Sequence, residues 1–80
     1  MAVVRLFGAA RACVGLPEIT IPAKSLHEVR NHLTTTYPSI APVLVKCSYL
    51  VNEVSQRDMD TPLGNADTVD VLPPFAGGSK

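Results

Sequence analysis

The chain begins with an alternation of apolar and polar residues that is typical of a half-buried β-strand. Residues 2–7 (AVVRLF) are rich in β-branched and aromatic side chains, and the segment stops at a glycine. If Val4 and Leu6 face the core, the period of two places Phe7 on the opposite face together with Arg5. We therefore expect a first strand over residues 2–7 with an aromatic side chain on its outer face.

Three further segments predict strands, over residues 18–21 (EITI), 48–54 (SYLVNEV) and 68–72 (TVDVL). The first of these is expected to pair antiparallel with residues 2–7, across a connection that has a helical turn near residues 9–13. In the last segment the alternation turns Val69 and Val71 inward and leaves Asp70 and Leu72 outside.

A helix is predicted after Ser25, because Ser25 and Glu28 have the spacing of a capping box. In that motif the serine hydroxyl accepts from the N–H of the third residue, and the glutamate accepts from the serine N–H. Apolar residues then recur at helical spacing up to Tyr37, and Pro38 ends the helix. Residues 39–46 (SIAPVLVK) predict a second, short helix, and residues 60–67 have the composition of a tight turn.

This order of elements predicts an α+β domain, with helices on one face of a mixed sheet. Eighty residues make one small domain, which buries only about 60–65% of its unfolded surface. Seven acidic residues balance seven basic ones and 46% of residues are apolar, so a general polyanion binder is excluded. The domain is expected over residues 1–72, with an extended tail over residues 73–80.

Two cysteines 34 positions apart and two histidines five positions apart match no metal-site or redox spacing. No metal and no bound cofactor are therefore expected. Without an apolar run long enough for a bilayer, or a basic start followed by an apolar segment, the chain is interpreted as cytoplasmic. No Ser/His/Asp, Cys/His or paired-carboxylate arrangement indicates an enzyme that acts alone.

The tail, VLPPFAGGSK, has a composition that a packed domain does not need. Pro73 and Pro74 supply no backbone N–H and favour an extended path. Gly77 and Gly78 have no Cβ and can pass through a slot too narrow for a side chain. The six residues from Pro73 to Gly78 reach about 20 Å when extended, enough to enter a partner's active site. On flexibility alone, however, the segment could also be an ordinary frayed end.

Four stretches, in this order, resemble the MoaD/ThiS-like ubiquitin-fold sulfur carriers, and among them the small subunit of molybdopterin synthase, MoaD. They are VRLFGAAR at residues 4–11, LHEVRNHL at 26–33, LVNE at 50–53 and DTVDVLPPFAGG at 67–78. Each stretch is weakly diagnostic alone. The strand followed by Pro-Pro-x-x-Gly-Gly makes the set specific and favours a working tail over a frayed one.

The resemblance implies a β-grasp fold, with a mixed sheet, one main helix, a short second helix and a flexible Gly-Gly tail. It further implies that a MoeB-like enzyme uses ATP to adenylate the carboxylate of Gly78, which is then converted to a thiocarboxylate. The sulfur would pass to precursor Z in the active site of a MoaE-like large subunit, within a heterotetramer. Nucleic acid and membranes are not among the partners implied.

The implied partner-binding surface combines an outer patch of the sheet with the tail. Phe7 and Leu72 would lie on neighbouring parallel strands, with Arg5 and Arg11 as a basic rim. An alternative role for Phe7 is that of a strand residue half covered by the following loop. Along the tail, the residues expected to contact the partner are Pro73, Pro74, Phe75 and Ala76, whereas Gly77 is assigned to the reacting end together with Gly78.

Ser79 and Lys80 depart from the family pattern, in which the carrier form ends at the second glycine. While they are attached, Gly78 has no free carboxylate. Three explanations remain open: a protease trims them, they were added by cloning, or the carrier role has been lost. Other pathways are also open, namely thiamine, cysteine or tRNA thiolation, protein conjugation, or a β-grasp adaptor without chemistry.

Overall fold

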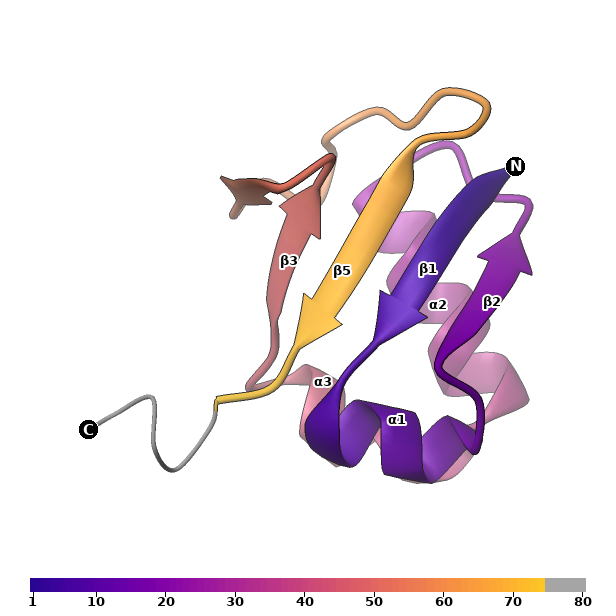
Figure 1. Cartoon of the computed structure of the whole chain (residues 1–80), viewed down its shortest axis with the longest axis vertical. Coiled ribbons are helices and arrows are strands. Elements are labelled where there is room, and N and C mark those ends of the chain that lie inside the picture. Colours follow the sequence, from indigo (N-terminus) through magenta and orange to yellow (C-terminus); the bar gives the residue numbers. More distant parts are fainter. Residues whose placement is uncertain (75–80) are drawn as a thin grey trace.

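The computed structural model describes residues 1–74 as a sheet covered on one face by helices, as predicted (Figure 1). The elements are β1 (Ala2–Leu6), α1 (Gly8–Val14), β2 (Glu18–Ile21), α2 (Leu26–Thr36), the 3₁₀ helix η1 (Pro38–Ile40), α3 (Ala41–Leu44), β3 (Ser48–Val51), β4 (Val54–Gln56) and β5 (Thr68–Leu72). The five strands lie in the order β2-β1-β5-β3-β4. None of the helices described is long and apolar enough to cross a membrane.

The sheet is mixed, and its central strand is the last one in the sequence. β1 pairs antiparallel with β2 and parallel with β5, while β3 pairs antiparallel with both β5 and β4. β5 is thereby hydrogen-bonded on both edges. Because β1 and β5 are parallel, both strands end at the same edge of the sheet, beside α1 and α3 (Figure 1).

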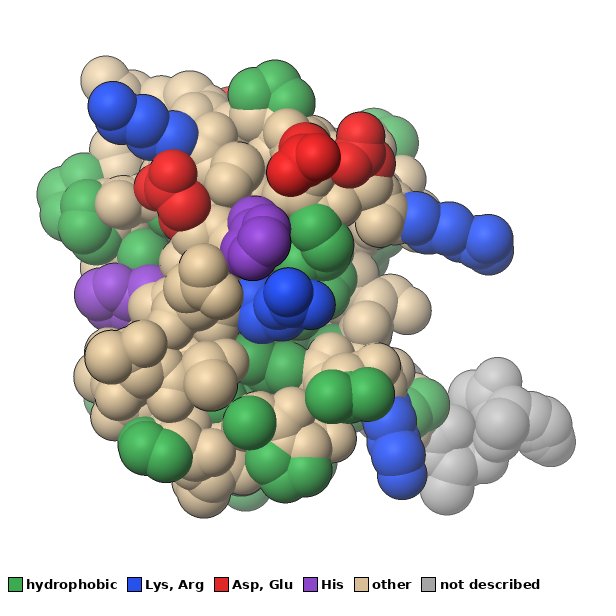
Figure 2. Space-filling model, turned by 180° about the vertical axis from the view of Figure 1, so that it is seen from behind, with side chains coloured by type: hydrophobic (Ala, Val, Ile, Leu, Met, Phe, Trp, Pro, Cys, Tyr) green, Lys and Arg blue, Asp and Glu red, His purple; other side chains and the backbone are tan. Residues whose placement is uncertain are grey.

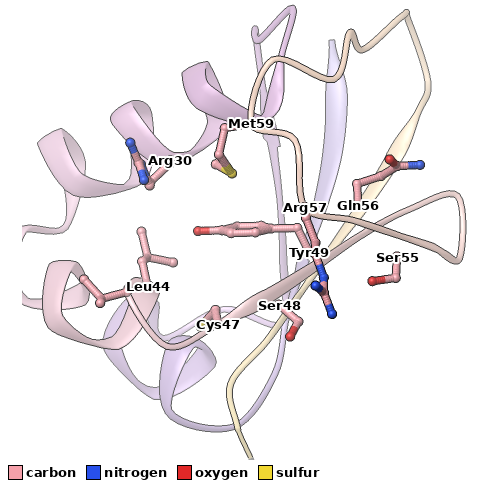
Figure 3. Close-up of a pocket in the computed structure, with 10 residues that line it drawn as sticks. Arg30, Leu44, Cys47, Ser48, Tyr49, Ser55, Gln56, Arg57 and Met59 are labelled. Atoms are coloured by element: carbon pink, nitrogen blue, oxygen red, sulfur yellow. The ribbon is translucent and has the colours of Figure 1, made fainter.

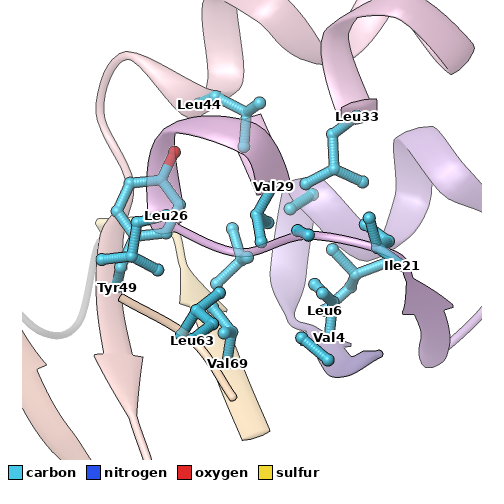
Figure 4. Close-up of a cluster of buried hydrophobic side chains, with 14 of the residues drawn as sticks. Val4, Leu6, Ile21, Leu26, Val29, Leu33, Leu44, Tyr49, Leu63 and Val69 are labelled. Carbon is cyan, nitrogen blue, oxygen red and sulfur yellow. The ribbon is translucent and has the colours of Figure 1, made fainter. Parts of the chain in front are cut away.

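The core lies between the sheet and α2, and its residues follow the predicted alternation (Figure 4). Val4, Leu6, Val69 and Val71 are at most 1% exposed, which confirms the predicted inward faces of β1 and β5. Leu26, Val29 and Leu33 of α2 cover them and are also fully buried. Burying a side chain of this size stabilises the fold by about 1.5–3 kcal/mol.

The N-terminus of α2 is capped, but not by the predicted capping box in full. The Glu28 N–H donates to the Ser25 hydroxyl oxygen at 3.3 Å, as expected. The Glu28 carboxylate, however, accepts from the N–H of Lys24 at 3.0 Å, one residue before the N-cap. The reciprocal bond therefore secures the chain just ahead of the helix.

The connection after β1 forms a complete helix, so the prediction of a single turn near residues 9–13 was too short. Gly8 allows the sharp change of direction with its φ of 53°. At the other end Gly15 has a φ of 84°, and its N–H donates to the Arg11 carbonyl oxygen at 2.7 Å. Left-handed glycine caps of this kind commonly end helices.

The predicted third strand over residues 48–54 is confirmed only as far as Val51, where β3 ends, because the chain then reverses and starts β4 at Val54. Asn52 and Glu53 have φ values of 50° and 71°, and they form the turn between β3 and β4. The Asn52 side-chain oxygen accepts from the Thr68 N–H at 3.0 Å, and the Asn52 N–H donates to the Thr68 carbonyl oxygen at 2.8 Å. These bonds to β5 hold the turn in its left-handed conformation.

On the helical side of the molecule the basic side chains are dispersed rather than clustered. Figure 2 shows Lys and Arg side chains separated from one another on this face, and the two histidines apart at the surface. His27 and His32 are exposed, in agreement with their interpretation as surface residues. Cys13 and Cys47 are both half-buried free cysteines.

Candidate functional site

The last strand, β5, is firmly anchored in the sheet. Val69 and Val71 are completely buried, and the strand is paired on both edges. After Leu72, Pro73 is buried and Pro74 is exposed. The backbone thus leaves the centre of the sheet at a fixed place and direction. The predicted site residues Phe75, Ala76, Gly77 and Gly78 lie outside the described residues.

Phe7 and Leu72 occupy corresponding positions at this edge of the sheet. The last register pair of the parallel strands joins Leu6 to Val71, so each of the two residues follows a paired one. Both side chains are half-buried rather than fully exposed. Phe7 is also the N-cap of α1, and its carbonyl oxygen accepts from the N–H of Ala10 at 3.1 Å.

The predicted basic rim is divided between two different environments. Arg11 is exposed on α1 and remains available to a partner. Arg5 donates through Nε and Nη2 to the two carboxylate oxygens of Asp70, at 2.5 and 2.7 Å. This hydrogen-bonded carboxylate raises the pKa of the Arg5 guanidinium above its ordinary value.

Asp70 lies on the outer face of the sheet, as the alternation predicted, but its burial was not foreseen. It is only 6% exposed because Arg5 lies against it. The signal was present in the sequence, since opposite charges at facing positions of two strands form pairs. Finding it required knowing that β1 and β5 are neighbours and that Arg5 faces Asp70.

A pocket of about 420 Å³ lies on the face of the sheet that the helices cover, among α2, α3 and the β3–β4 hairpin (Figure 3). Its walls include Arg30, Leu44, Tyr49, Arg57 and Met59. The Tyr49 ring points from β3 between Arg30 and Leu44. Sequence reasoning did not identify this pocket, because its walls come from separate segments of the chain that only the tertiary fold brings together.

Two titratable groups in the pocket wall have raised pKa values. Burial, with a smaller contribution from nearby Cys13, raises the pKa of the Cys47 thiol to about 11. Burial also raises the pKa of Tyr49 to about 12; Cys47 adds to this rise and the Arg30 charge opposes it. Both groups are therefore protonated and neutral at physiological pH.

Solved structures with the same fold cover nearly the whole chain. The small archaeal modifier protein 1 from Methanosarcina acetivorans has a TM-score of 0.85 at 24% identity, over 96% of this chain and 95% of its own. CysO in the Amycolatopsis orientalis BexX/CysO complex has a TM-score of 0.83 at 19% identity, over 98% of this chain and 100% of its own. These two likenesses establish the ubiquitin-like β-grasp fold.

A further similar chain belongs to the complex of subunits 1 and 2 of the molybdopterin-converting factor from Helicobacter pylori. That chain matches the present one with a TM-score of 0.75 at 28% identity, over 96% of this chain and 97% of its own. No curated protein sequence matches the chain. The ThiS family model, in contrast, matches residues 4–78, from the first strand to the second glycine of the tail. The chain therefore belongs to the ThiS family of MoaD/ThiS-like, ubiquitin-fold sulfur carriers.

Proposed function

We propose that the chain carries sulfur as a thiocarboxylate on Gly78, formed through an acyl adenylate after Ser79 and Lys80 are removed. The observation that carries this proposal is the family match, which runs to residue 78 and stops before Ser79. The position of β5 supports it. A strand bonded on both edges presents the following segment from a rigid base.

The chemistry requires activation because a carboxylate is a poor acceptor for sulfur. A carboxylate oxygen of Gly78 attacks the α-phosphorus of ATP, and pyrophosphate leaves. A sulfur donor whose sulfur has the oxidation state of hydrosulfide then attacks the acyl carbon and displaces AMP. The product is a nucleophilic sulfur held through an acyl carbon. Both steps take place on the activating enzyme, so the carrier needs no general base of its own.

The carrier's contribution is recognition and delivery. An 80-residue chain has little room for a core and a catalytic cleft together. In this proposal Phe7, Leu72 and Arg11 contact the partner beside the exit of the tail, and Pro73 and Pro74 direct the tail outward. Arg5 instead supports this surface from within the sheet, through its pair with Asp70.

We assign the carrier to molybdopterin synthase, as the small subunit that donates sulfur to precursor Z beside a MoaE-like large subunit. Support comes from the Helicobacter pylori complex of subunits 1 and 2, one chain of which shares the fold over 96% of this chain at 28% identity. Carriers for cysteine, thiamine or tRNA thiolation, or for protein conjugation, would use the same thiocarboxylate. The partner, rather than the tail chemistry, distinguishes these pathways.

The test compares the full chain with one ending at Gly78. Each is incubated with a MoeB-like activating enzyme, ATP and a sulfur donor, and its intact mass is measured. The trimmed chain should gain the mass difference of one oxygen replaced by sulfur, and the full chain should not. Adding a MoaE-like subunit and precursor Z should then return the trimmed chain to its carboxylate mass.

Two outcomes distinguish the carrier function from its assignment to molybdopterin synthase. A trimmed chain that stays unmodified with the activating enzymes of all these pathways would refute the carrier function. A trimmed chain that is thiolated but transfers no sulfur to precursor Z would refute only the molybdopterin assignment. Transfer to a different acceptor would then name the pathway.

A further inference from the structure

The pocket beside Tyr49 contains a buried polar atom that the described residues leave unpaired. Tyr49 is 6% exposed, and its hydroxyl has no hydrogen-bond partner within residues 1–74. Leaving a buried hydroxyl without a partner is costly, and most such groups are paired. A phenol hydroxyl both donates and accepts. Its position between Arg30 and Leu44 therefore favours a polar ligand atom at the inner end of the pocket (Figure 3).

The charge of the pocket wall indicates whether the ligand is an anion or a cation. Two arginines, Arg30 and Arg57, line the pocket, and no Asp or Glu does. Within the described part of the chain the ion pair is formed by Arg5 and Asp70, so neither pocket arginine is engaged in one. Arg30 is also close enough to Tyr49 for its charge to lower that residue's pKa, against the larger effect of burial. A cation beside a neutral hydroxyl donor suits an anion with acceptor oxygens.

The remaining wall is mixed: Ser48, Ser55 and Gln56 are polar, and an apolar part beside them would contact the body of the ligand. Leu44, Val45 and Met59 line the pocket, and Val45 is 83% exposed, an unusual state for a large aliphatic side chain. Inorganic phosphate would leave this apolar wall uncovered. A volume of about 420 Å³ is within the range of small-molecule sites, about 300–1,000 Å³.

We propose that this pocket binds a small aliphatic carboxylate, with its oxygens on the Tyr49 hydroxyl and Arg30 and its apolar body against Leu44, Val45 and Met59. The hydroxyl donates to one carboxylate oxygen, and the guanidinium donates to the other. Arg30 is an exposed, long side chain and Met59 is flexible, so both can shift to admit the ligand. The site goes beyond the carrier function proposed above and does not depend on it.

The carboxylate could belong to a free acid or to the C-terminus of a peptide, and two probes separate these sources. The full chain, labelled with ¹⁵N, is titrated with 4-methylpentanoate and, separately, with N-acetyl-alanyl-leucine, while backbone amide shifts are recorded. Saturable shifts are expected at residues around the pocket, with a dissociation constant on the order of 1 mM for so small a probe. Tighter binding of the free acid or of the peptide identifies the source, and either result supports the carboxylate site.

The chemistry of recognition is tested with the uncharged amide of each probe and with two variants. The amides should bind at least about 10-fold more weakly than the acids, because they lose the charge-assisted bond. Tyr49→Phe should weaken binding of the acid about 3- to 10-fold, the usual effect of one hydrogen bond. Arg30→Gln should weaken it further and should reduce the difference between acid and amide. Tyr37→Phe, which changes the same residue type outside the pocket, should leave binding unchanged.

Melting curves of the variants test whether a loss of binding comes from destabilisation of the fold. Tyr49→Phe removes an unpaired hydroxyl, so its melting temperature should not fall. The proposal is overturned if no saturable shift appears up to about 10 mM acid. It is equally overturned if acid and amide bind alike, if inorganic phosphate binds more tightly than the acid, or if both pocket variants bind as the unmodified chain does.

Discussion

Arg5 and Asp70 face each other across the parallel strands β1 and β5, and the guanidinium holds both oxygens of the carboxylate. The two side chains differ in their access to water: counting side-chain atoms alone, Arg5 is 40% exposed and Asp70 is 8% exposed. The pair lies one register position before the end of the paired strands. It therefore joins the first strand of the chain to the strand that precedes the tail.

Because of this difference, we expect the two halves of the pair to contribute unequally to stability. Arg5→Gln leaves a nearly buried carboxylate without its cation, which is the costly way to break a pair. Asp70→Asn leaves an arginine that can turn into water, and the amide can still accept a bond. Thermal unfolding should show the larger fall in melting temperature for Arg5→Gln. Equal falls, or a larger one for Asp70→Asn, would contradict this account.

The second prediction concerns Phe7, which the proposed docking surface needs beside the tail. Phe7→Ala should weaken binding to a MoaE-like subunit by more than about 1 kcal/mol, as loss of an aromatic anchor does. Leu50→Ala is the matched control, since Leu50 is a half-buried apolar residue paired with Asp70 farther along the sheet. Calorimetric titration measures both. If Phe7→Ala unfolds the domain but spares binding in the folded fraction, Phe7 belongs to the core instead.

The glycines of the tail give a third prediction. In chains ending at residue 78, Gly77→Ala and Gly78→Ala add a methyl group that a narrow channel in the partner would resist. A displacement of the reacting carbonyl by about 1 Å can cost on the order of 100-fold in rate. Thiocarboxylate formation and sulfur transfer should slow accordingly, while unfolding free energies change by no more than about 0.5 kcal/mol. Unchanged rates in both variants would exclude a tight channel.

Stability should decline at alkaline pH, because the folded protein holds protons that the unfolded chain releases. The Cys47 thiol has a pKa of about 11 against an ordinary value of 9.0, and Tyr49 about 12 against 10.0. Above pH 9 the unfolded chain therefore binds fewer protons than the folded one, and the free energy of unfolding falls with rising pH.

Urea denaturation midpoints between pH 8 and about 11 measure this decline. Cys47→Ala should reduce it from its onset near pH 9, and Tyr49→Phe should reduce it at the upper end of the range. Cys13→Ala removes a neighbouring thiol but leaves Cys47 and Tyr49 in place, so most of the decline should remain. The same slope in all three variants would show that other groups cause it.

The cap of α2 provides a fifth prediction, on stability alone. Ser25→Ala removes the acceptor for the Glu28 N–H and should cost about 1 kcal/mol. Ser39 is an exposed serine of η1, and Ser39→Ala should change the free energy of unfolding by no more than about 0.5 kcal/mol. Chemical denaturation distinguishes the two. A neutral Ser25→Ala would mean that the bond between Glu28 and Lys24 holds the turn by itself.

Local sequence patterns predicted the elements whose geometry is set by burial. Val4, Leu6, Val69 and Val71 alternate with a period of two, and the structure confirms both strands. The turn at Asn52 and Glu53 escaped prediction because its usual sequence signal, a glycine at the second position, is absent. Asn52 adopts the turn through bonds to Thr68, a residue 16 positions away.

For the candidate site, too, part could be predicted from local sequence and part depends on contacts between distant residues. The resemblance to a family drew attention to Phe7, Leu72 and the tail, and the structure brings the first two to one edge of the sheet. The pairing of Arg5 with Asp70 joins two residues that are 65 positions apart in the sequence. The pocket at Tyr49 depends on the packing of α2 and α3 against the hairpin, which no local pattern specifies.

The parallel pairing of β1 with β5 has a mechanical consequence. The two strands point the same way, and the N-terminus of β1 and the C-terminus of β5 lie at opposite ends of their shared ladder. A pull applied between the two ends of the chain therefore shears this ladder along its length. All of its hydrogen bonds are loaded together, whereas a hairpin pulled apart at its open end loses its bonds one by one. An unfolding enzyme that pulls on the tail while the N-terminus is held would therefore pull along the direction in which the sheet resists unfolding most strongly.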